Sequence, residues 1–118
     1  MPRSTLSLRR DDVVLVSFPF SDLSGQKLRP ALIVGRPLGD DVILAFITSR
    51  TAAAVAAAEH AFTPHDPEFT ITGLRTASRV RLNKVATLHR SLIRRRLGHI
   101  GPRTKRAVDR ALRYVFQL

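Results

Sequence analysis

Three short apolar runs near the start of the chain constrain the fold most strongly. They are Asp12 to Phe18 (DVVLVSF), Ala31 to Gly35 (ALIVG) and Val42 to Thr48 (VILAFIT). Each is rich in β-branched residues and is bounded by proline, glycine or polar residues, which is typical of a buried strand. The short links between them favour antiparallel neighbours, because a parallel crossover needs a dozen residues or more.

The middle of the chain also contains predicted strands. Ser78 to Leu82 (SRVRL) alternates polar and apolar residues, as a half-exposed strand does. The stretches KVATL and SLIRRRLGHI also read as strands, although the second is compatible with a helix. The segment AAAVAAAEH predicts either a short helix or a surface segment ahead of a strand near Ala61 and Phe62.

The C-terminal segment predicts a helix. In GPRTKRAVDRALRYVFQL, apolar residues recur every three or four positions, charged residues occupy the other side, and Pro102 stands near the start. We therefore expect a mainly β fold with a C-terminal helix: one domain, residues 1–118, built on a small, strongly bent antiparallel sheet or barrel.

Composition excludes several classes of function. The chain has no cysteine, so it has no disulfide framework, thiolate metal site or cysteine nucleophile, which fits a reducing cytoplasm. No apolar run is long enough to span a membrane, and MPRSTLSLRRDD lacks the apolar core of a signal peptide. There is no P-loop, dinucleotide fingerprint or nucleophile elbow, and we expect no metal and no cofactor. Metal-ligand spacing is missing among the four histidines, which are His60, His65, His89 and His99.

The charge is large and unevenly distributed. The chain has 20 lysines and arginines against 9 acidic residues, a net charge of +11. Residues 60–118 alone hold 13 basic and 3 acidic residues. Most of these basic residues are arginines, which suit bidentate contacts with phosphate or carboxylate. The asymmetry favours nucleic acid or an acidic protein segment as the partner.

Two polar residues at strand ends are expected to meet. Arg29 precedes the second apolar run, and Thr48 ends the third. If these two strands are antiparallel neighbours, the start of one lies beside the end of the other. A fixed guanidinium and a hydroxyl directed at one point form a suitable phosphate site.

At these residues the chain resembles the MazF/PemK toxins of bacterial toxin–antitoxin modules. The matching pieces are DVVLVSFPFSDLSGQKLRPALIV, DVILAFITS and TGLRTASRVRLNKVATLHRSLIRRRLG, in family order, followed by the terminal helix. The resemblance implies a compact SH3-like barrel of the MazF/PemK/CcdB type, a homodimer and a cytoplasmic endoribonuclease. It further implies metal-independent cleavage of single-stranded RNA by the 2′-hydroxyl, leaving 5′-hydroxyl ends, and neutralisation by an acidic antitoxin.

The resemblance also assigns residues. The catalytic pair falls on Arg29 and Thr48, and a flap falls on the loop SDLSGQK. The chain departs from the family pattern at Asn83, where a carboxylate is often seen, and at Asp11, where glycine is common. Residues implied to contact RNA are Ser24, Lys27, Ser49, Arg81 and Asn83.

Two other functions stay open. An amide cannot act as a general base, so Asn83 is compatible with a catalytically inactive RNA- or protein-binding module on the same barrel. A related barrel toxin poisons gyrase, but that activity has no need of the pair Arg29 and Thr48.

Overall fold

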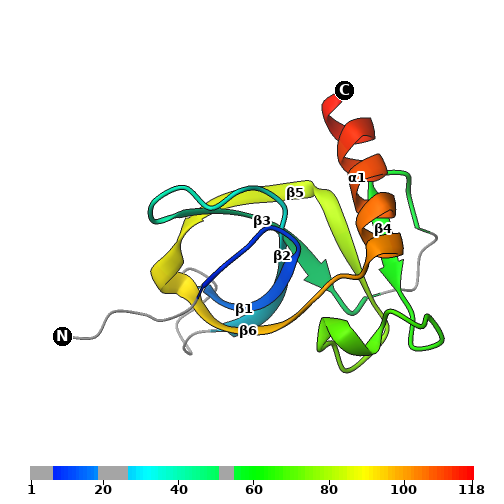
Figure 1. Ribbon diagram of the computed structural model, residues 1–118, viewed down its shortest axis with the longest axis horizontal. Helices are drawn as coiled ribbons and strands as arrows, with labels where there is room; N and C mark the ends of the chain where they lie inside the picture. The colour runs from blue at the N-terminus through cyan, green and yellow to red at the C-terminus, as the bar shows by residue number, and fades with distance from the viewer. Residues whose placement is uncertain (1–6, 19–26, 51–54) are drawn as a thin grey trace.

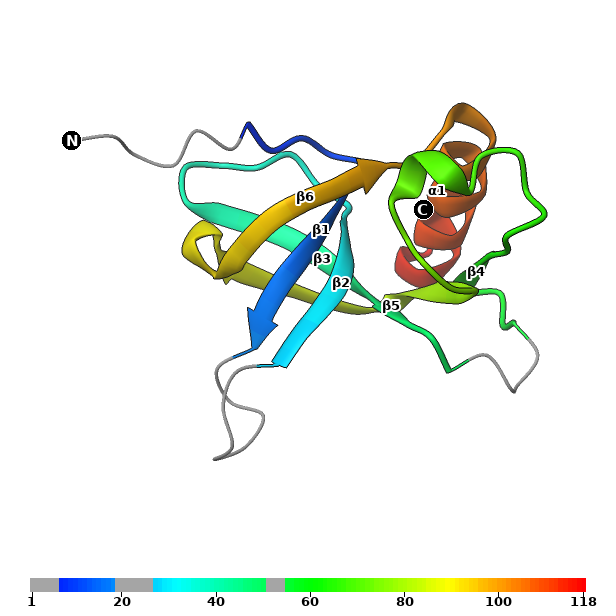
Figure 2. The ribbon, with the colours of Figure 1, turned by 90° about the horizontal axis from the view of Figure 1, so that it is seen from below.

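The computed structural model describes residues 7–18, 27–50 and 55–118. Its six strands form one antiparallel sheet, in the order β4-β5-β3-β2-β1-β6, and the sheet curves round on itself (Figures 1 and 2). No helix in these ranges is both long and apolar enough to cross a membrane. The strands are β1 (Asp12–Phe18), β2 (Lys27–Ile33), β3 (Asp41–Thr48), β4 (Glu59–Phe62), β5 (Ser78–His89) and β6 (Ile93–His99), with 3₁₀ turns η1 (Thr70–Thr72) and η2 (Arg90–Leu92) and one helix, α1 (Pro102–Phe116).

The expected mainly β fold with a C-terminal helix is confirmed. The curved sheet is not closed, because β4 and β6 stand at its two edges. The helical alternative for SLIRRRLGHI is wrong, since most of that stretch is β6. Of the alanine-rich segment, residues 52–54 lie outside the described residues, and its end enters β4.

Apolar residues on both sides of the sheet are buried in two clusters. One includes Val13 and Leu82 together with Val108 and Ala111 of α1. The other includes Val14 and buried residues of the neighbouring strands, and it contains no residue of the helix. Consecutive residues of β1 belong to different clusters because alternate side chains of a strand face opposite sides.

Helix α1 begins without a cap from its own sequence. Its N-cap residue is Gly101, and the carboxylate of Glu68 replaces the missing side chain by accepting the backbone N–H groups of Arg103 and Thr104 at 3.0 and 2.9 Å. A Cβ atom at position 101 would lie 2.5 Å from Glu68 Cδ, so glycine leaves the carboxylate its place. These hydrogen bonds, with that of Thr104 N–H foremost, lower the pKa of Glu68.

The turn before β1 has an unusual backbone. Asp11 adopts φ +80°, a region that favours glycine. Asp11 takes this glycine-like conformation itself, and its N–H and C=O groups hydrogen-bond to Ile33 and Ile100. Its carboxylate also accepts from Lys105 Nζ at 2.9 Å, which ties the turn to α1.

Candidate functional site

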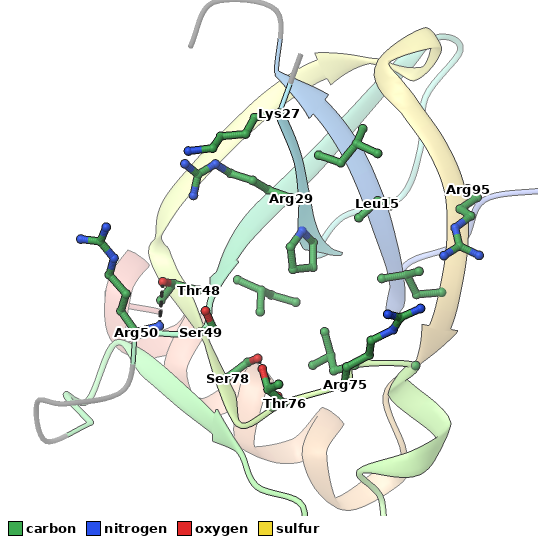
Figure 3. A pocket seen from close by; sticks show the side chains of 16 residues that line it. Leu15, Lys27, Arg29, Thr48, Ser49, Arg50, Arg75, Thr76, Ser78 and Arg95 are labelled. Atoms are coloured by element: carbon green, nitrogen blue, oxygen red, sulfur yellow. Dashed lines mark hydrogen bonds between the residues drawn. The ribbon is translucent and has the colours of Figure 1, made fainter. Parts of the chain in front are cut away.

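A cavity of about 540 Å³ opens beside the ends of β2 and β3 (Figure 3). Its apolar residues lie on the same face of the sheet as the cluster that includes residues of α1. Leu15 lies two positions after Val13 on β1, and Ile47 lies two positions after Ala45 on β3, and residues two apart in a strand share a face. The lining residues are Leu15, Lys27, Leu28, Arg29, Pro30, Ile47, Thr48, Ser49, Arg50, Gly73, Leu74, Arg75, Thr76, Ser78, Arg95 and Leu97.

Arg29 and Thr48 both line this cavity, from β2 and from the end of β3. The pairing of β2 with β3 ends at Ala31 opposite Phe46, and Arg29 and Thr48 each lie two residues beyond that last pair. Arg29 pairs with Val16 of β1, which holds its backbone on that side. The arrangement expected from the order of the strands is therefore present.

The hydroxyl of Thr48 is oriented by its own turn. The backbone N–H of Arg50 donates to Thr48 Oγ1 at 3.1 Å, and Figure 3 shows this bond at the edge of the cavity. Because the oxygen already accepts one hydrogen bond, its own proton stays available for an acceptor in the cavity.

Positive charge gathers in the cavity without compensation from its walls. The described lining residues include five cations and no aspartate or glutamate. Other basic residues are paired elsewhere: Arg10 meets Asp109 at 2.7 Å, and Arg96 meets Asp12 at 2.9 Å. An anionic ligand would supply the charge that the described lining residues lack.

The structure brings together some of the residues expected to contact RNA and not others. Lys27 and Ser49 line the cavity with Arg29 and Thr48, whereas Ser24 and most of the expected flap lie outside the described residues.

Arg81 and Asn83 are not among the lining residues. Arg81 Nε lies 3.6 Å from Glu59 Oε2, and Asn83 is an exposed residue of β5. Alternation decides this, because Ser78, Val80 and Leu82 are the β5 residues that turn inward. A role of Arg81 or Asn83 in binding RNA stays a prediction.

Several lining residues were not singled out as site residues from the sequence. Arg50 directly follows the strand-end pair TS and could have been included on position alone. Ser78 is the first residue of β5, and its hydroxyl donates to the carbonyl of Thr76 at 2.9 Å. Arg75 and Arg95 belong to a loop and to β6, and no local pattern of the sequence indicates that they meet.

The described lining holds no imidazole. His60 instead borders a separate hollow with Arg110 and Tyr114. Burial lowers the pKa of His60, and Arg110 adds to this effect while Asp66 and Glu68 oppose it. Within the described ranges no group of three or more histidine or acidic side chains could hold a metal ion.

One family model matches most of the chain. The model of the PemK-like, MazF-like toxins of type II toxin–antitoxin systems matches residues 9–116. A search of the curated proteins finds no match.

Solved structures share the fold. An endoribonuclease in complex with its cognate antitoxin, from a Mycobacterial species, has 21% identity and a TM-score of 0.72, over 95% of this chain and 97% of that one. The Mycobacterium tuberculosis toxin MazF-mt6 has 22% identity and a TM-score of 0.70, over 91% and 97%. A chain of the MazE–MazF structure from Deinococcus radiodurans has 17% identity and a TM-score of 0.69, over 94% and 96%.

Proposed function

The chain belongs to the PemK-like, MazF-like toxins of type II toxin–antitoxin systems, and from this premise we propose that it is a toxin endoribonuclease that cleaves single-stranded RNA. The observation that carries the proposal is that Arg29 and Thr48 line one cavity, with five cations and no carboxylate among its described lining residues. The endoribonuclease named among the solved structures supports the same reaction class.

The reaction we propose is attack of the RNA 2′-hydroxyl on the adjacent phosphorus. The 2′-oxygen bonds to phosphorus and loses its proton to water, while the bond to the 5′-oxygen breaks and that oxygen gains a proton from water. The products are a 2′,3′-cyclic phosphate and a 5′-hydroxyl end. The phosphorane formed on the way carries extra negative charge, which the site has to stabilise.

Arg29 and Thr48 supply that stabilisation. The guanidinium of Arg29 can donate two parallel hydrogen bonds to the non-bridging oxygens. Thr48 adds a third, because the N–H of Arg50 leaves its hydroxyl proton free. Strand pairing and the following Pro30 restrict the backbone of Arg29, so the donors are in place before the charge develops.

Charge stabilisation has to supply most of the acceleration in this scheme. The described lining residues include no aspartate, glutamate or histidine that could act as a strong base. We therefore propose a metal-independent reaction in which the fixed donors lower the energy of the phosphorane.

The partners we propose follow from the family and the charge. The net charge of +11 suits both RNA and an acidic antitoxin. We also propose a cytoplasmic homodimer whose contact surface includes Phe116, which is 56% exposed, whereas Leu112 and Val115 already pack against the core of their own chain. Light scattering at micromolar concentration tests the dimer, and a monomeric mass would contradict it.

A second candidate is an RNA-binding module without catalysis. The absence of a carboxylate or imidazole from the described lining favours it, because such a site can bind phosphate without removing a proton.

One experiment separates these functions. The purified protein is mixed with a long single-stranded RNA in EDTA, and the fragments and their ends are analysed. We expect discrete fragments with 5′-hydroxyl ends, and a rate lowered about 100-fold or more in Arg29→Ala, because removal of one fixed donor typically costs that much. Arg106→Ala, which removes one exposed charge from α1, is the matched control.

Three outcomes would contradict the proposal. RNA that is bound but stays intact would favour the binding module. RNA that is neither bound nor cut would favour a toxin with a protein target. Equal rates for wild type and Arg29→Ala, with both folded, would remove Arg29 from the site.

A further inference from the structure

We propose that Arg75 and Arg95 form a second phosphate subsite in the same cavity, which holds a neighbouring phosphate of the RNA strand. The inference rests on the proposed function, because it takes RNA as the ligand and Arg29 with Thr48 as the place of cleavage. It divides the cavity into a cleavage side and a holding side.

Strand order places Arg95 across the cavity from the cleavage side. Leu15 of β1 pairs with Pro30 of β2 on one side and with Arg95 of β6 on the other. These three residues therefore lie in one row across the sheet. The backbones of Pro30 and Arg95, at its two ends, are two inter-strand spacings, or about 10 Å, apart. In Figure 3 the guanidinium groups of Arg29 and Arg95 lie on opposite sides of the opening, which suits two phosphates of one strand.

Two glycines bring Arg75 to the same wall as Arg95. A Cβ atom on Gly73 would lie 2.2 Å from the carbonyl oxygen of Leu97, and one on Gly98 would lie 2.2 Å from that of Ile71. The loop before β5 thus packs backbone to backbone against the end of β6. The side chain of Arg75 leaves this loop on the side of Arg95, as Figure 3 shows.

Both guanidinium groups are available for a ligand. Arg75 and Arg95 are exposed, and no carboxylate of the described residues pairs with either of them. The next residue on β6 behaves differently, because Arg96 is held by the buried carboxylate of Asp12 at 2.9 Å. The adjacent arginines of β6 thus have different surroundings, and Arg95 is the one that reaches the cavity.

The surface between the two sides is apolar. Leu15 lies between Pro30 and Arg95 in the sheet, and Leu15, Pro30, Ile47 and Leu97 all line the cavity. A nucleoside joins any two successive phosphates of RNA, and its base or ribose can cover these apolar side chains. Along the cavity, two groups of cations are therefore separated by an apolar surface, as two phosphates of an RNA strand are separated by a nucleoside.

Binding of uncleavable RNA tests the subsite without requiring cleavage. The probes are random-sequence 2′-O-methyl RNAs, one a dinucleotide with a single internal phosphate and one of about six nucleotides, titrated by NMR against the full chain. We expect the double variant Arg75→Ala, Arg95→Ala to weaken binding of the longer probe at least fivefold and to change binding of the dinucleotide less than twofold. Arg29→Ala should weaken both probes, and Arg106→Ala neither.

Salt dependence gives an independent measurement on the longer probe. Each phosphate contact on a single strand contributes about −0.7 to the slope of log affinity against log salt. The double variant should therefore lose about 0.7 of slope if its two guanidinium groups share one phosphate. In RNA cleavage the same variant should raise KM while kcat stays within twofold, which a general loss of structure would not produce.

The outcomes separate this inference from the proposed function. A double variant that binds the longer probe as tightly as wild type, or that weakens both probes equally, would overturn the subsite and leave the cleavage site standing. Wild-type protein that binds neither probe would overturn both proposals.

Discussion

The close contact between the loop before β5 and strand β6 leads to a prediction with a measurable size. It compares three alanine substitutions that differ in what the added Cβ atom meets. Gly39 has φ +58° with no atom within 4 Å of the new Cβ, whereas Gly73 has φ +76° with Leu97 O at 2.2 Å. Gly98 lies outside the positive-φ region, but its Cβ would meet Ile71 O at 2.2 Å.

The expected losses of unfolding free energy follow from these contacts. Gly39→Ala carries only the left-handed backbone cost of about 1 kcal/mol, partly offset by about 0.4–1 kcal/mol from the less flexible unfolded chain. Gly98→Ala forces backbone apart, which costs about 1–3 kcal/mol before the same offset. Gly73→Ala combines both terms and should lose about 2–4 kcal/mol before the same offset.

Urea unfolding followed by circular dichroism measures the three values. The order of destabilisation should be Gly73→Ala, then Gly98→Ala, then Gly39→Ala. The difference between Gly73→Ala and Gly39→Ala isolates the clash with β6, because both residues have a similar φ. If the two variants have the same free energy of unfolding within about 0.5 kcal/mol, a margin set by the usual scatter of additivity, the contact between loop and strand is not tight.

Three further predictions concern charged and polar residues. Because the pKa of Glu68 lies below the ordinary 4.5, its carboxylate stabilises the fold above pH 4.5 and loses this effect as the pH falls through the lowered pKa. Glu68→Gln should therefore be less stable than wild type at pH 7. A series of urea unfolding curves at decreasing pH should show this difference in stability shrinking. Glu59→Ala should cost about 1–3 kcal/mol of unfolding free energy, because it leaves the neighbouring arginines without this carboxylate, whereas Arg81→Ala removes a side chain that is 42% exposed and should cost about 0–1 kcal/mol; equal losses would contradict this reading. Asn83→Ala should cleave RNA within about twofold of wild type, since its side chain lies outside the cavity, and a loss as large as that of Arg29→Ala, which is about 100-fold, would place part of the reaction on another surface.

Local patterns in the sequence predict most elements of this fold. β1 begins and ends where the apolar run Asp12 to Phe18 does, and α1 begins at the proline expected near its start. β2 begins at Lys27, ahead of the apolar run that starts at Ala31, because pairing with β1 extends the strand back through polar residues that carry no strand signal. The stretch KVATL, predicted as a strand, is confirmed as the later part of β5, although the sequence does not show that it is continuous with the strand beginning at Ser78.

Part of the candidate site could likewise be predicted from the sequence, and part could not. Arg29 and Thr48 could be brought together on paper, because neighbouring antiparallel strands have a definite geometry. Arg75 and Arg95 could not, because their meeting depends on the approach of a loop to a strand that follows it by many residues. The conformation of Asp11 was equally out of reach, since aspartate at φ +80° is held by backbone bonds to Ile33 and Ile100.

The cap on α1 has a consequence for the order of folding. Glu68 reaches Thr104 across 36 residues, and the helix has no side chain of its own to satisfy its first N–H groups. Helix nucleation in water is unfavourable, and a contact of this sequence separation requires the intervening chain to be brought together first. The helix therefore completes its first turn only after β5 and β6, which lie between the two residues, have closed the distance. A peptide of residues 99–118 should accordingly show little helix by circular dichroism, although the same residues form 15 residues of helix in the whole chain.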